Sequence, residues 1–255
     1  MSLSKRFHLL LKVVPIVVML LVAKVVINRL NLEFITVDGL VPSLVAGAIF
    51  LIGFLLSHVM AHYKEAERMP GEMRAALEAI HDDMASFART RPDVDMASLK
   101  TALSEIVTTL ETGLGVEGHH HELARTEAQV DGLTLRFGDV EALGMPEPYV
   151  VRLRNSQDTL RKTLFRISYV QTMESVPSMR LLVQTLVVAC LILILFIRTE
   201  GSWESFMIVA FVSYLFVYAL SMIQLLEEPF RTGEGTVDDV SLYLLRDFAT
   251  KMEGR

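Results

Sequence analysis

The residues best suited to chemistry are three adjacent histidines, His119-His120-His121. Imidazole nitrogens bind zinc and copper. Consecutive side chains point in different directions on any regular element, and neither a cysteine nor a spaced histidine accompanies these three, so we expect a solvated loop and no metal site. The sequence also lacks a Gly-rich phosphate loop, an H-E-x-x-H motif, a Gly-x-Ser-x-Gly elbow and paired carboxylates inside an apolar block. It therefore predicts neither an enzyme nor a cofactor.

A second candidate is the exit motif, Leu226-Glu227-Glu228-Pro229-Phe230, which directly follows an apolar block. Proline lacks an N–H group and stops a helix, so Pro229 predicts a helix end. We expect the carboxylates of Glu227 and Glu228 to lie in water and Phe230 to turn back and pack. Farther along, Glu234 and Asp238-Asp239 supply further carboxylates.

The third candidate is an apolar stripe in the block 40–61. Helical spacing places Ala46, Phe50, Phe54, Ser57 and Ala61 on one side, and Gly47 and Gly53 beside them allow another helix to approach. If several copies met around an axis, the stripe would form a hydrophobic neck ringed by phenyl groups, whose positive edges tolerate anions. Ordinary helix packing or lipid contact is the alternative, and on these residues alone it is the simpler one, because phenylalanine is common in spans.

Four apolar blocks must position these candidates, at about residues 9–27, 40–61, 181–197 and 205–226. Each is close to the ~20 residues that cross ~30 Å of hydrocarbon as a helix. The chain is 52% hydrophobic but also 21% charged, so part of it must lie in water. No small-residue cleavage site follows the first block, which we therefore expect to be a mature helix and not a signal peptide.

Lysine and arginine at the block ends predict the orientation, since these residues favour the cytoplasmic side. They flank the central segment and the N-terminal end (Lys5, Arg6, Lys12, Lys64, Arg68, Arg161, Lys162, Arg166 and Arg180), whereas the loops 28–39 and 198–204 carry one arginine each. Both termini and residues 62–178 are predicted to be cytoplasmic. Lys24, near the outer end of the first block, is expected to extend its ammonium group to the lipid headgroups, with a buried functional charge as the less favoured alternative.

The central segment reads as helices separated by Pro and Gly. The first continues the second span to about residue 89, with an apolar face of Met73, Leu77, Ile80, Met84 and Phe87. Others are predicted near 99–113, 122–143 and 149–170. The expected fold class is an all-α membrane protein with four spans (1–62 and 179–226), a helical cytoplasmic domain (63–178) and a cytoplasmic C-terminal segment (227–255).

Charge and cysteine content exclude other classes. Residues 63–178 hold 19 acidic and 13 basic side chains, and the whole chain has a formal charge of −6, which disfavours nucleic acid. The single cysteine, Cys190, rules out a disulfide within the chain and is expected to fill space. The predicted helix 149–170 carries five cationic residues that either line an anion path or form a solvated face: Arg152, Arg154, Arg161, Lys162 and Arg166.

Four short segments of the sequence, in the order in which they occur, resemble the bestrophin family of anion channels, particularly its bacterial members. They are Ile49-Phe50-Leu51-Ile52-Gly53-Phe54 in the second span, Tyr63-Lys64-Glu65-Ala66-Glu67-Arg68 after it, Val176-Pro177 before the third span, and the exit motif after the fourth. The resemblance covers both pairs of spans and little of the middle.

The resemblance implies a pentamer that conducts chloride or similar anions passively through a central pore. Its neck would be built from second spans, with Ala46, Phe50 and Phe54 facing the pore and Ala46 smaller than the isoleucine usual there. A second constriction would lie at Val176 or Met179. Localisation in a bacterial inner membrane, surrounding lipids and the absence of a nucleic-acid partner are expected with it.

Two departures from the family pattern qualify these expectations. Animal bestrophins place a dense acidic run after the Pro-Phe, where it clasps calcium. Here Arg231-Thr232-Gly233-Glu234-Gly235-Thr236-Val237 dilutes that run, so calcium gating is not predicted. The aromatic, Arg-rich cluster at the cytoplasmic exit of the second span is replaced by His58, His62 and Tyr63.

Two other classes stay open. One is an energy-coupling or stator-type subunit of the flagellar-motor kind, which also places a large cytoplasmic segment between spans two and three. That class needs a partner helix that carries an intramembrane carboxylate. It also needs third and fourth spans patterned with Thr or Pro to serve that carboxylate, and the third and fourth spans of this chain do not show that pattern. The other is a membrane-anchored helical scaffold or sensor. Its cytoplasmic helices would form an interaction surface, and no ion or solute would pass across the bilayer.

Overall fold

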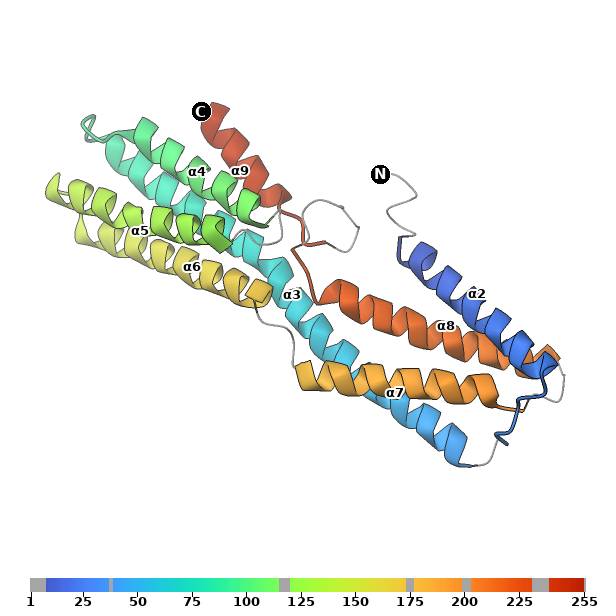
Figure 1. Ribbon diagram of the computed structural model, residues 1–255. Coiled ribbons are helices and arrows are strands. Elements are labelled where there is room, and N and C mark those ends of the chain that lie inside the picture. Colours follow the sequence, from blue (N-terminus) through green and yellow to red (C-terminus); the bar gives the residue numbers. More distant parts are fainter. Residues whose placement is uncertain are drawn as a thin grey trace. The chain divides into compact units, whose positions relative to one another are not determined.

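The computed structural model describes residues 8–36, 39–114, 120–172, 177–198, 203–230 and 239–254. Within these ranges the regular elements are helices, apart from one isolated β-bridge between Ile35 and Ile197. Figure 1 labels them as α2 (His8–Arg29), α3 (Leu40–Ala88), α4 (Met96–Leu114), α5 (His120–Ala142), α6 (Glu147–Thr172), α7 (Pro177–Phe196), α8 (Trp203–Leu226) and α9 (Tyr243–Gly254). The predicted all-α fold class is confirmed.

Four of these helices are long and apolar enough to cross a membrane: Leu9–Arg29, Val41–Ala88, Ser178–Phe196 and Phe206–Leu226. Each of them overlaps one of the four apolar blocks of the sequence, so the predicted number of spans is confirmed. The 49 residues of α3 exceed the ~20 that a bilayer requires, as expected for a second span that continues as an amphipathic helix.

The described residues divide into two compact units, and the boundary falls within α3 after Tyr63. We call them the span unit (8–63 and 177–228) and the bundle unit (64–172, 229–230 and 239–254). In the span unit, α2 packs against α7 and α8, and α7 packs against α8 (Figure 1). One core cluster joins α3 to α7 and α8, and its members include Ala48, Ile52, Leu55, Val59, Val183, Val187, Cys190 and Phe216. Cys190 therefore fills space, as predicted.

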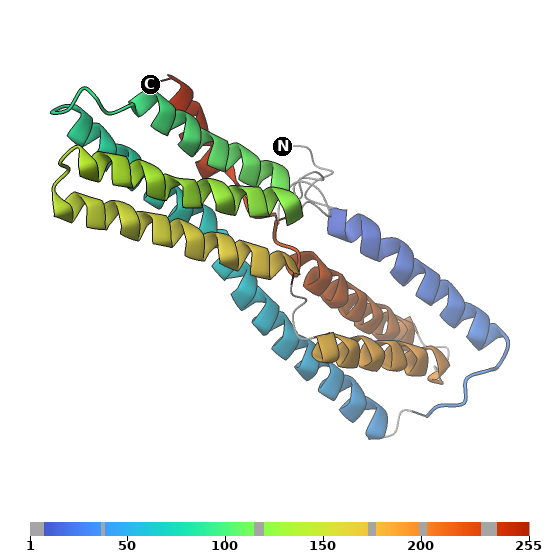
Figure 2. The same cartoon turned by 60° about the vertical axis from the view of Figure 1, so that its left-hand side comes forward.

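The bundle unit packs α4 against α5 and α9, and α5 against α6, and α4, α5 and α6 run side by side in both Figure 1 and Figure 2. Four residues of the predicted apolar face of α3 (Met73, Leu77, Ile80 and Met84) are buried. They share the core of this unit with Leu99, Leu103, Ile106, Leu110, Leu133, Phe137, Leu153, Leu160, Leu164 and Phe248. Periodicity at three- and four-residue steps thus predicted these packing faces.

Local signals explain several helix ends. Asp95 caps α4, because its Oδ1 accepts a hydrogen bond of 2.9 Å from the backbone N–H of Ser98. After α5, Gly144 adopts a positive φ of 88°, while the N–H of Met145 bonds to the carbonyl of Val140. This is the Schellman arrangement, in which glycine avoids the Cβ clash of the left-handed conformation.

The predicted elements omitted α9. Its buried face, Leu245, Phe248, Ala249 and Met252, has helical spacing that is readable in the sequence. Arg74 of α3 fixes this helix, since its guanidinium lies 2.8 Å from the Asp247 carboxylate and donates to the Leu244 carbonyl at 3.2 Å. The C-terminal segment is therefore an integral part of the bundle unit.

Candidate functional site

The α3 stripe, defined as Ala46, Phe50, Phe54, Ser57 and Ala61, lies exposed on one side of α3. The side chains of Phe50 and Phe54 are 73% and 59% exposed. The opposite side of the same helix carries Ala48, Ile52, Leu55 and Val59, all at most 4% exposed in the core of the span unit. The chain thus uses one side of α3 for its own core and leaves the phenyl side uncovered.

In the described part of the chain, no other helix closely approaches the glycines beside the stripe. A Cβ atom built at Gly47 or Gly53 would find no atom within 4 Å among the described residues. The described helices therefore do not make the close approach that these glycines permit. Apart from the hydroxyl group of Ser57, the stripe and its glycines present phenyl rings, methyl groups and bare backbone, and such a face is suited to packing, to lipid contact or to lining a water-filled path.

The predicted lower constriction is partly outside the described residues, because Val176 is not among them. Met179, in the first turn of α7, is partly buried and packs against the core cluster of the span unit. Its role as a constriction stays a prediction.

The exit motif follows the end of α8 at Leu226, as Pro229 predicts. Phe230 is 5% exposed, which confirms that it packs. Glu227, however, does not lie in water: its side chain is 8% exposed and one carboxylate oxygen is 3.3 Å from Nη1 of Arg180, in the first turn of α7. Only Glu228 is exposed as expected. Burial of Glu227 is possible because the arginine compensates the charge of the desolvated carboxylate.

Lys24 also departs from the favoured prediction, since its side chain is only 1% exposed and is held by groups within the span unit. Its ammonium group lies 2.9 Å from the carboxylate of Glu33 and donates to the carbonyls of Leu195 and Ile197 at the C-terminal end of α7. A cation there satisfies terminal carbonyls and suits the negative end of the helix dipole. Nearby, the Ile35 N–H donates to Phe196 and the Arg198 N–H donates to Ile35, at 3.2 and 2.8 Å.

The cationic residues of α6 are largely neutralised by acidic partners. Arg152 pairs with Asp83 at 2.9 Å, Arg154 with Glu141 at 3.0 Å, Arg161 with Asp131 at 2.7 Å, and Arg166 with Glu65. These pairs connect α6 to α3 and α5 within the bundle unit. The arrangement favours the solvated, paired face over an arginine-lined anion path.

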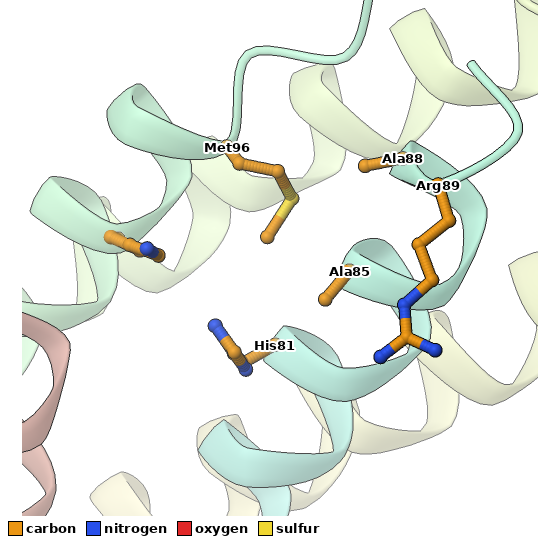
Figure 3. A pocket seen from close by; sticks show the side chains of 6 residues that line it. His81, Ala85, Ala88, Arg89 and Met96 are labelled. Carbon is orange, nitrogen blue, oxygen red and sulfur yellow. The ribbon is translucent and has the colours of Figure 1, made fainter. Parts of the chain in front are cut away.

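A shallow pocket of about 350 Å³ opens in the bundle unit between α3 and α4 (Figure 3). His81, Ala85 and Ala88 of α3 line it on one side together with Arg89, the residue directly after this helix, and Met96 and Lys100 of α4 line the other side. Nδ1 of His81 is 3.1 Å from Oδ1 of the neighbouring Asp82. The pocket has a cationic rim on an apolar floor, and it contains no set of nucleophile and base.

No group of three or more His, Cys, Asp or Glu residues suited to a metal ion occurs in the part of the chain that the structure describes. Of the three adjacent histidines, His119 lies outside that part, and α5 begins at His120. Glu234 and Asp238 also lie outside it. That no calcium clasp forms after Phe230 therefore stays a prediction from the sequence.

Fold and site together define an all-helical integral membrane protein with four spans and a helical bundle. More particularly, the chain has the bestrophin-like fold. Its structure is similar to that of a bacterial bestrophin homolog from Klebsiella pneumoniae, solved as a point mutant, with a TM-score of 0.75 and 17% identity over 97% of each chain. A second mutant of that homolog gives a TM-score of 0.73 at 18% identity over 98% of each chain. A structure described as that of a membrane protein matches with a TM-score of 0.70 and 18% identity over 100% of both chains.

By sequence, no protein-family model and no curated protein matches the chain. The similarity therefore lies in the fold, and it confirms the bestrophin resemblance as a resemblance of architecture. Sequence reasoning missed the partners of Lys24 and Glu227. The available signal was an oppositely charged residue beside an apolar block in each case: Glu33 in the loop after the first block for Lys24, and Arg180 directly before the third block for Glu227.

Proposed function

We propose that this chain is a subunit of a homo-oligomeric, pentameric channel that conducts chloride or similar anions passively. In this proposal the α3 stripes of the subunits surround the pore, with Ala46, Phe50 and Phe54 at the neck. No cofactor takes part, and the chemical work is limited to removing part of the ion's hydration and selecting its charge.

One observation carries the proposal: Phe50 and Phe54 are exposed at 73% and 59% on the side of α3 that faces away from the subunit's own core. Lipid-facing side chains are also exposed in a single subunit, for example Met19 on α2 and Ile192 on α7. The stripe differs from these by its alternation of phenyl rings with Ala46, Gly47, Gly53, Ser57 and Ala61. Small residues permit several helices to converge on an axis, which bulky lipid-facing residues do not.

The charge preference follows from the ring geometry. A phenyl ring has a negative face and a positive edge, so rings that present their edges to a pore stabilise an anion and not a cation. With only apolar groups at the neck, a passing ion is bound weakly and leaves quickly, as conduction requires.

The proposal is tested by recording currents from purified protein in planar bilayers under a tenfold KCl gradient. A chloride-selective pore reverses near the chloride equilibrium potential, about 59 mV from zero at 25 °C. A reversal potential of the opposite sign would refute the anion preference, and protein that is folded but electrically silent would refute the channel and favour a scaffold. Particle mass provides a separate test, because five copies of the 28.6 kDa chain amount to 143 kDa.

A further inference from the structure

Two histidines stand side by side on α3 beyond the phenyl rings of the stripe. His58 and His62 are four residues apart, and the centroids of their rings lie 4.6 Å from each other at an interplanar angle of 72°. His62 is exposed and His58 partly exposed. In the part of the chain that the structure describes, neither imidazole forms a hydrogen bond or an ion pair, so both rings are available to a ligand.

The spacing and the ring separation suit a shared metal ion. Histidines at positions i and i+4 of a helix project from the same side and form the paired ligands of helical zinc sites. Because a Zn–N bond is about 2.0–2.1 Å, the two coordinating nitrogens must come within about 4 Å of each other. Rings already 4.6 Å apart reach this by small side-chain rotations. Ser57 and Ala61, small and exposed on neighbouring positions, leave room for the ion and its water ligands.

We propose that His58 and His62 form a binding site for a divalent first-row transition metal, with zinc, copper or nickel as the chemical class. Imidazole nitrogen favours these ions over calcium and magnesium, which require oxygen ligands. The chain supplies two ligands and no third His, Cys, Asp or Glu joins them among the described residues, so water completes the coordination. The site is therefore an exchangeable one and not the closed four-ligand kind that holds a fold together.

Other histidines compete in any binding measurement and must be removed or controlled. His119, His120 and His121 are adjacent in sequence, and His81 lies next to Asp82 in the bundle unit. A suitable background is the full-length chain with these three adjacent histidines changed to asparagine, purified without a histidine tag. His81→Gln is the matched control, since it removes one imidazole from α3 without altering the proposed pair.

The test is calorimetric titration of this background with Zn²⁺. Saturable binding of one ion per chain is expected, and His58→Gln or His62→Gln should abolish it, whereas His81→Gln should not. A spacing control, Ser57→His combined with His58→Gln, keeps the number of imidazoles but places them five residues apart, about 140° around the helix; it should also lose binding. Elution volume and helical circular dichroism show that each variant is folded.

Electron paramagnetic resonance of bound Cu²⁺ gives an independent readout. Hyperfine coupling to two imidazole nitrogens is expected in the background, and to no more than one in either single variant. The proposal is overturned if the background binds no Zn²⁺ saturably. It is also overturned if folded His58→Gln and His62→Gln retain that binding, or if the spacing control binds as tightly as the background.

Discussion

Phe50→Ala should change ion conduction while leaving the subunit's own fold almost intact. Phe50 is 73% exposed, so only 27% of its surface contacts the rest of the subunit. Truncating a fully buried phenylalanine costs about 3–5 kcal/mol. Scaled to the buried fraction, the cost within the subunit is about 1 kcal/mol. A stability effect of that size does not by itself remove a channel from the membrane.

The same substitution should lower stability slightly but raise the ion flux, and the rise in flux has a different physical origin. If Phe50 contributes a phenyl ring from every subunit to one neck, its removal widens the constriction and shortens the dehydrated path. A barrier lowered by about 1 kcal/mol raises the ion flux about fivefold. Phe54→Ala should act in the same direction, because Phe54 lies one helical turn away on the same stripe.

Phe211→Ala is the matched control, because Phe211 is 66% exposed on α8 and its truncation removes the same atoms from a different helix. Chloride or iodide efflux from proteoliposomes, normalised to the reconstituted protein, compares the three variants with the wild type. Flux should rise in Phe50→Ala and Phe54→Ala and stay unchanged in Phe211→Ala. Equal flux in all four proteins would contradict the assignment of the stripe to the neck, because it would make Phe50 an ordinary lipid-facing residue.

Three further predictions concern the parts that hold the subunit together. Lys24→Met should destabilise the detergent-solubilised protein by about 3–5 kcal/mol, because it removes the cation that compensates the charge of the buried Glu33 carboxylate. Adding Glu33→Gln should recover part of the lost thermal stability, and no recovery would disprove the pairing. Phe248→Ala, at a fully buried position, should cost about 3–5 kcal/mol and expose α9 to limited proteolysis, in contrast to Tyr243→Ala, whose side chain is 66% exposed. Hydrogen bonds from Lys251 and Arg74 lower the pKa of Asp247, so its stabilising contribution is present above pH 3.8 and disappears as the pH falls through the lowered value. The melting temperature of Asp247→Asn, measured as a function of pH, should lack this loss of stability in acid. A variant with the same pH profile as the wild type would contradict the stabilising role of the Asp247 carboxylate.

Much of the fold was predictable because it depends on local properties of the sequence. An apolar run of ~20 residues predicts a span whatever it packs against. The periodic faces of α3 and α4 likewise identified their buried sides, for example Met73, Leu77 and Leu103, before any partner helix was known. The omission of α9 is the exception: the spacing of its apolar residues is readable, but a helix of 12 residues is marginal alone, and the packing that stabilises it comes from other segments.

The candidate site was predictable as a set of positions and not as an arrangement. Helical spacing alone put Ala46, Phe50 and Phe54 on one side of α3, and His58 next to His62 along the helix. Which side of α3 faces the subunit's own core was decided by α7 and α8, whose buried residues lie more than a hundred positions away. The wrong expectations for Lys24 and Glu227 have the same cause, since each charge was judged without its partner.

The sequence by itself thus determined the number of spans, the helical fold class and the composition of the α3 stripe, because length, hydropathy and periodicity act within a single helix. Only the tertiary structure decided that the phenyl side of α3 remains uncovered, that Arg180 compensates Glu227 and that Glu33 with two carbonyls near the end of α7 holds Lys24. The physical reason is that burial of a charge or a ring depends on groups distant in sequence. Their approach is set by the packing of whole helices.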